Sequence, residues 1–175
     1  VIDNPGKVSE YILTCRSMGI QMLPPDINEG ESGFSVTGKG IRYALTAIKT
    51  VGWPVAEVIE QERAARGPFT NLKDFITRVA DKEINKRAIE NFIKAGALDS
   101  LGGTRKQFMS VYVQILDAIT RDKKNNLAGQ LSLFDIADDS HKEEFDIRMP
   151  DVGEYSKEML LAFEKEVLGI YLSGH

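Results

Sequence analysis

Residues 47–56 read AIKTVGWPVA, and this string sets the architecture predicted for the whole chain. It joins the apolar end of one helical pattern to a helix that begins at Pro54, because proline is tolerated at the first helical position. In the tight turn between them, Gly52 is expected to supply a backbone conformation with φ > 0. Such a turn directs backbone N–H groups outward at a helix N-terminus, where an anion is favoured. The string therefore predicts a hairpin that holds one phosphate of a nucleic-acid backbone, without regard to base sequence.

A second turn of the same kind follows at residues 94–97, Lys-Ala-Gly-Ala. The usual hairpin pattern is Gly-apolar-Gly; Thr50 replaces its first glycine, and the second copy has only Gly96. Taken singly, each turn fits a plain connection between two helices at least as well as it fits a DNA-binding hairpin. Two such turns in the correct order predict a tandem helix-hairpin-helix domain over residues 47–124. The expected DNA contacts are Lys49, Thr50, Val51, Gly52, Trp53, Lys94, Ala95, Gly96, Ala97, Arg105 and Lys106.

The hydrophobic periodicity around these turns predicts a mainly α protein. The expected helices cover residues 8–18, 54–66, 71–79, 85–94, a longest one from Thr104, and 156–168. Residues 23–26 are expected to be extended, and residues 33–37 and 41–45 to form a small β-hairpin near the N-terminus. The last helix is expected to bury Met159, Leu160, Phe163 and Val167.

Helix starts are marked by side chains that can cap them. Asn71 can cap one helix, and Thr104-Arg105-Lys106-Gln107 has the form of a capping box. After Asn125 the periodicity fails, and residues 125–153 are polar, acidic and rich in turn residues. We therefore expect a flexible linker there, followed by a C-terminal helix.

Charge is unevenly distributed along the 175 residues, although the formal net charge is only −4. Residues 37–124 carry a balance of +6, between flanks of −3 (residues 1–36) and −7 (residues 125–175). A basic block between acidic flanks fits a core that binds a polyanion, and it fits a solvated surface equally well.

Composition excludes several classes of site. A single cysteine, Cys15, leaves no internal disulfide, and with no visible signal peptide or membrane span it favours a cytoplasmic location. His141 and His175 lack partners at metal-ligand spacing, so no metal site is expected. The acidic pairs at 138–139 and 143–144 are read as solvated charge, so no catalytic residue and no cofactor are expected in this chain.

The acidic linker contains one apolar string, Gln130-Leu131-Ser132-Leu133-Phe134. Large apolar side chains in a polar linker either fold back on their own domain or are covered by a partner. In a preformed groove, Leu133 and Phe134 would fill an apolar pocket and Gln130 would supply directional hydrogen bonds. The string resembles the sliding-clamp-binding motif of bacterial replication proteins.

Together these strings resemble the C-family of bacterial replicative DNA polymerases, the DNA polymerase III α subunits. Further similar strings are LPPDIN at 23–28, IRYAL at 41–45, NKRAI at 85–89, KAGALD at 94–99 and YLSGH at 171–175. The resemblance implies an internal fragment whose polymerase carboxylates, with their Mg²⁺, lie upstream, so this piece alone is expected to be inactive. It also implies duplex DNA, the sliding clamp (β subunit) and other replicase subunits as partners, and no membrane.

The resemblance also suggests four parts: the end of a fingers-like region (1–46), the tandem helix-hairpin-helix domain (47–124), the linker with its clamp-binding peptide (125–153), and a helix leading onward (154–175). Two other functions stay open. One is a DNA-repair lyase that uses Lys86 or Lys94 as a Schiff-base nucleophile, which needs a desolvated lysine. The other is a pure protein-interaction domain.

Overall fold

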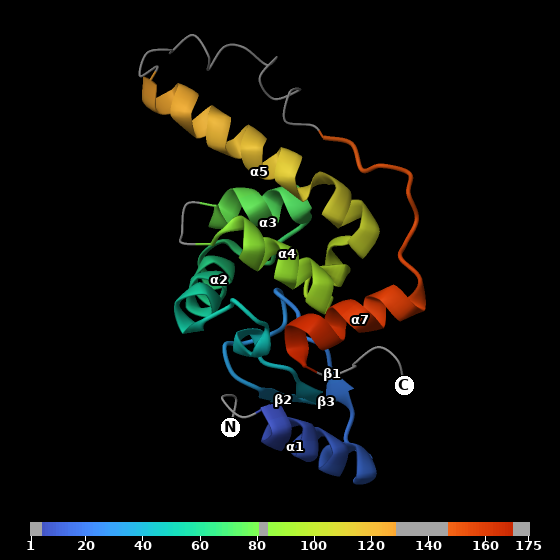
Figure 1. Ribbon diagram of the computed structural model, residues 1–175. Helices are drawn as coiled ribbons and strands as arrows, with labels where there is room; N and C mark the ends of the chain where they lie inside the picture. The colour runs from blue at the N-terminus through green and yellow to red at the C-terminus, as the bar shows by residue number, and fades with distance from the viewer. Residues whose placement is uncertain (1–4, 81–83, 129–146, 170–175) are drawn as a thin grey trace.

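The computed structural model describes residues 5–80, 84–128 and 147–169 (Figure 1). The mainly α fold class is confirmed, with a small sheet near the N-terminus and a helix near the C-terminus. The helices are α1 (Pro5–Ser17), α2 (Trp53–Arg66), α3 (Leu72–Val79), α4 (Lys86–Ala95), α5 (Arg105–Ala128) and α7 (Lys157–Leu168). Two single 3₁₀ turns, η1 (Leu45–Ala47) and η2 (Asp99–Leu101), lie just before α2 and α5.

The sheet contains the predicted hairpin and one strand that was predicted only as extended chain. β2 (Ser35–Thr37) and β3 (Gly40–Arg42) pair antiparallel, and β1 (Met22–Leu23) pairs parallel with β3 on its other side. Both hairpin strands are shorter than predicted. The second apolar run leaves the sheet after Arg42, because the next three residues enter the buried core and the last of them begins η1.

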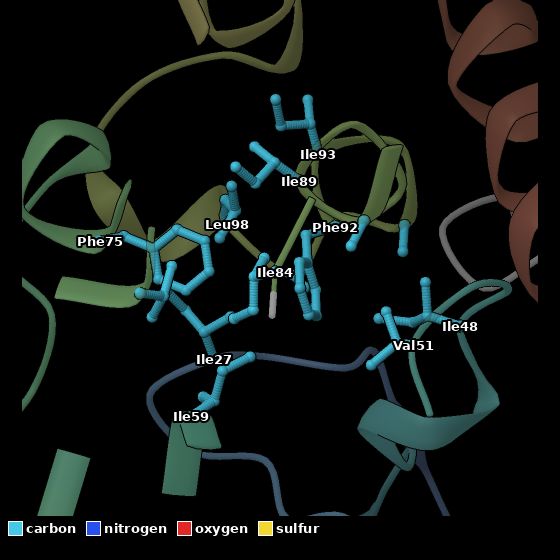
Figure 2. Close-up of a cluster of buried hydrophobic side chains, with 14 of the residues drawn as sticks. Ile27, Ile48, Val51, Ile59, Phe75, Ile84, Ile89, Phe92, Ile93 and Leu98 are labelled. Carbon is cyan, nitrogen blue, oxygen red and sulfur yellow. The ribbon is translucent and has the colours of Figure 1, made fainter. Parts of the chain in front are cut away.

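The core lies among α2, α3, α4 and α5 and includes side chains next to both predicted interhelical turns. Figure 2 shows part of this core. The predicted apolar faces of α3 and α4 are buried: Leu72, Phe75, Ile76 and Val79 on α3, and Ala88, Ile89, Phe92 and Ile93 on α4. Phe75 makes edge-to-face contacts with Phe69 and Phe92, at centroid distances of 5.1 and 5.8 Å. Val51, in the first turn, and Leu98, directly after the second turn, insert into the same core, so both turns are anchored from inside.

Side-chain caps begin the helices where the sequence predicts them. Asn71 accepts a hydrogen bond from the Asp74 N–H at 2.7 Å, and Asn85 accepts one from the Ala88 N–H at 2.8 Å. The capping box of Thr104 and Gln107 is reciprocal, with distances of 2.9 and 3.1 Å. These caps orient α3, α4 and α5 around the two turns.

Two predictions about the C-terminal third are wrong. α5 continues to Ala128, so the non-helical segment begins at least four residues later than predicted. In α7, Met159 is exposed instead of buried, and Leu160 and Phe163 are half-buried. The reason is that α7 packs against α4 mainly through its last two turns, where Glu164, Val167 and Leu168 are buried (Figure 1).

Candidate nucleic-acid interface

The first hairpin, residues 48–53, depends on a positive φ at Thr50 and not at Gly52. Thr50, which replaces the first glycine of the usual pattern, has φ of 69°. The expectation for Gly52 is wrong: its φ is −85°, and a Cβ built there would lie 3.6 Å from Pro54 Cδ, an ordinary contact. Positive φ in a β-branched residue is strained, so surrounding contacts must hold Thr50 in place.

Those contacts come from α4 and α7. The Asn91 side chain on α4 is 7% exposed, and its Nδ2 donates to the Lys49 carbonyl oxygen and to Thr50 Oγ1, both at 2.9 Å. The Lys49 N–H donates to the Val167 carbonyl oxygen at the end of α7, also at 2.9 Å. Sequence reasoning missed Asn91; the available signal was one amide on an otherwise apolar helix face.

The outer surface of the first hairpin is open. Lys49, Thr50 and Gly52 are exposed, as is 54% of Trp53. Gly52 is the N-cap of α2 and gives it no side-chain cap. No described residue accepts a hydrogen bond from the Gly52 or Trp53 backbone N–H. Unsatisfied N–H groups at a helix N-terminus attract an anion, so this hairpin can bind a phosphate.

The second hairpin, residues 94–97, is closed. Gly96 has the predicted left-handed conformation, with φ of 83°. Its N–H bonds the carbonyl groups of Ile93 and Phe92, and the Ala97 N–H also bonds Phe92. Ala95 and Ala97 are buried. The N–H groups predicted to point outward here are therefore used inside the turn.

Arg105 is a buried structural residue, which is at odds with a role in contacting a phosphate. The residue is 5% exposed, and its guanidinium pairs with Asp99 at 3.0 Å and with Glu164 at 3.1 Å. Burial opposes its charge, but hydrogen bonds and charges from both carboxylates raise the pKa of Arg105 above its ordinary value. Burial raises the pKa of Asp99, although its bonds to Arg105 act in the opposite direction.

A carboxylate already occupies the anion position at the N-terminus of α5. The two Glu154 oxygens accept hydrogen bonds from the Arg105 and Lys106 N–H groups, at 3.0 and 3.1 Å. Next to it, Thr104 Oγ1 donates to the Gly153 carbonyl at 2.6 Å. The half-buried Lys106 side chain places its Nζ 5.9 Å from the Tyr155 ring centroid. Residues 153–155 thus cover the helix end that the sequence assigned to DNA.

Lys94 is paired, and its side chain is only 14% exposed. Its Nζ lies 3.6 Å from a Glu90 oxygen and 3.3 Å from a Glu166 oxygen. Lys86, the other lysine considered for lyase chemistry, is exposed. Lys86 is not desolvated, and Lys94 is held by two carboxylates, so the structure gives the lyase alternative no support.

The remaining predicted features concern metals, membranes and the clamp. Within residues 5–80, 84–128 and 147–169, no cluster of three or more His, Cys, Asp or Glu side chains could hold a metal ion. In the same residues no helix combines the length and hydrophobicity needed to cross a membrane. The clamp-binding prediction, Gln130 to Phe134, lies outside the described residues.

Comparison with known proteins shows which family the chain belongs to and which proteins it is similar to. Residues 19–108 match the helix-hairpin-helix motif family. The chain is similar, across 99% of its length, to the DNA polymerase III α subunits of Borreliella burgdorferi (40% identity), Mycobacterium leprae (38%) and Mycobacterium tuberculosis (39%). The chain spans about 15% of the length of these curated relatives.

Proposed function

The chain belongs to the helix-hairpin-helix motif family, and from this premise we propose that it is a duplex-DNA-binding module of a bacterial replicative DNA polymerase. The observation that carries the proposal is the open first hairpin, where no described residue accepts from the Gly52 and Trp53 N–H groups beside the exposed Lys49. Backbone N–H groups read no base, so the binding is independent of sequence. Under this proposal, the longer polymerase that contains this chain carries out nucleotide polymerisation with Mg²⁺. It does so in the cytoplasm.

Only one of the two hairpins makes the primary contact in this proposal. In the second hairpin the N–H groups of Gly96 and Ala97 bond within the turn, and Lys94 pairs with Glu166. Nearby, Glu154 occupies the N-terminus of α5 and Arg105 pairs with Glu164. A module with few phosphate contacts binds weakly, with Kd of about 10⁻⁴–10⁻⁶ M, and loses affinity as salt rises.

Charge reversal at the first hairpin tests this function. Lys49→Glu is expected to weaken binding to duplexes of every sequence by about tenfold at 0.1 M salt, because one phosphate contact is lost. It should also lower the salt slope, which is the steepness of the fall of log K with log salt concentration, by about 1. Fluorescence anisotropy with labelled duplexes of mixed sequence measures both quantities.

The matched control is Lys157→Glu, the same charge change at the exposed first residue of α7. The first hairpin contacts the other end of that helix, through Val167. Equal losses in the two variants would mean that binding is diffuse and that the first hairpin is not its centre. If the wild-type chain bound no duplex at low salt, the proposed function would be refuted.

We also propose that residues 130–134 tether the polymerase to its sliding clamp, as the resemblance of QLSLF to the clamp-binding motif suggests. Leu133→Ala with Phe134→Ala is expected to cost about 3–6 kcal/mol of clamp binding, since burying each side chain is worth about 1.5–3 kcal/mol. That loss is about a hundredfold or more in Kd.

Titration of the purified clamp by calorimetry checks this prediction. Ser132→Asp is the matched control, and it should bind normally because the family motif admits either residue. DNA binding and the thermal midpoint should be unchanged in both variants. A double alanine variant that binds the clamp as the wild type does would refute the tethering proposal and leave the DNA-binding proposal untouched.

A further inference from the structure

A basic pocket lies beside the first hairpin, on the outer face of α4. It has a volume of about 280 Å³ and opens to solvent. Its lining residues are Lys86, Arg87, Glu90, Asn91, Lys94 and Glu166. Lys86 and Arg87 are not among the DNA contacts expected from the sequence, and they lie in the first turn of α4.

The pocket and the first hairpin form one continuous surface. Asn91, in the pocket wall, is the residue whose amide holds Lys49 and Thr50. Glu166, in the opposite wall, precedes Val167, whose carbonyl accepts the Lys49 N–H. A ligand that touches the first hairpin is therefore next to the pocket.

The charges in the pocket leave two cations for a ligand. Glu90 and Glu166 both pair with Lys94, at 3.6 and 3.3 Å. Lys86 and Arg87 are exposed, and among the described residues neither forms an ion pair. An exposed arginine beside a lysine suits the oxygens of a phosphate, because a guanidinium binds two of them in parallel.

From this arrangement we infer that the pocket binds phosphodiester groups of the same DNA strand that contacts the first hairpin, through Lys86 and Arg87. The inference rests on the proposed function and adds a second contact region to it. From residue 86 to residue 94, α4 extends about 12 Å at 1.5 Å per residue, while one strand carries a phosphate about every 3.4 Å of duplex axis. The pocket face is thus long enough to meet more than one phosphate.

The Glu166 carboxylate is an anion that competes with a DNA phosphate for the Lys94 ammonium. A phosphate that enters must share the Lys94 ammonium with the Glu166 carboxylate, whose side chain is 57% exposed. Like charges repel, so Glu166 weakens binding of the strand. Removing this carboxylate is expected to raise DNA affinity.

The test is salt-dependent binding of a labelled mixed-sequence duplex. Lys86→Ala with Arg87→Ala is expected to lower affinity by about tenfold or more at 0.1 M salt and the salt slope by about 2, because two phosphate contacts disappear. Lys39→Ala with Arg121→Ala removes the same charge from two exposed positions outside the pocket and should cause a much smaller change. Glu166→Gln is expected to bind severalfold more tightly.

Failure of this inference can be distinguished from failure of the proposed function. If Lys49→Glu weakens binding while the pocket variant behaves like the control pair, the first hairpin binds DNA and the pocket does not. Unchanged affinity in Glu166→Gln would also count against the pocket. Equal thermal midpoints of all variants establish that the fold is intact. If the wild type does not bind duplex, both proposals fall.

Discussion

Replacing Arg105 with methionine is expected to lower the free energy of unfolding by about 3–5 kcal/mol. The guanidinium holds Glu164, which is 1% exposed, at 3.1 Å. Without it, the buried Glu164 carboxylate keeps its desolvation cost and loses the positive charge of this guanidinium. For a chain of this size the thermal midpoint should fall by about 10 °C.

Two further variants separate this effect from a general cost of losing an arginine. Arg121→Met, at an exposed position of α5, should change stability by less than about 0.5 kcal/mol. Arg105→Met combined with Glu164→Met should recover much of the loss, because a buried ion pair can be replaced by apolar groups. Urea unfolding followed by circular dichroism measures all three. A loss of under about 1 kcal/mol in the single variant would show that Glu164 is not dependent on Arg105.

Gly96→Ala is the second large effect we expect, with Gly102→Ala as its matched control. Both glycines have positive φ, 83° and 85°, so alanine should cost about 1–2 kcal/mol at either position from backbone conformation alone. A Cβ at Gly102 meets nothing within 4 Å. A Cβ at Gly96 lies 2.4 Å from Arg105 Nη2 and 3.1 Å from Asp99 Oδ2.

The collision at Gly96 is costly because the guanidinium is fixed by its two carboxylates. We therefore expect Gly96→Ala to destabilise the chain by about 2 kcal/mol more than Gly102→Ala, since it strains a buried ion pair as well as the backbone. Parallel thermal and urea unfolding of the two variants gives the difference directly. Equal destabilisation would mean that Arg105 moves aside freely.

Local signals predicted the helices well. Asn71 and Thr104 each have a short polar side chain at a helix start, and each caps its helix as expected. Asn85, which was predicted only as the start of a helix, also caps it. Short strands were harder to predict. β1 has only two residues, and two residues are too few to show the alternation of apolar and polar side chains that marks a strand. The error at Met159 has a similar origin: a helical pattern identifies an apolar face, but not how far along the helix a neighbour covers it.

The candidate interface was predicted less well, because a cation's sequence position does not reveal its partner. Arg105 and Lys94 were grouped with the DNA contacts for their charge. Their carboxylates, Glu164 and Glu166, lie 59 and 72 residues away in the chain and meet them only after folding. The tight turn was predicted, but its positive φ was assigned to Gly52 and belongs to Thr50.

The length of α5 has a geometric consequence for the two proposed attachments. Its 24 residues span about 36 Å. α5 begins beside the second hairpin, packs against α3 and α4, and ends two residues before Gln130 (Figure 1). Under the two proposals, α5 therefore sets how far the start of the clamp-binding peptide can lie from the core that carries the DNA-binding hairpin.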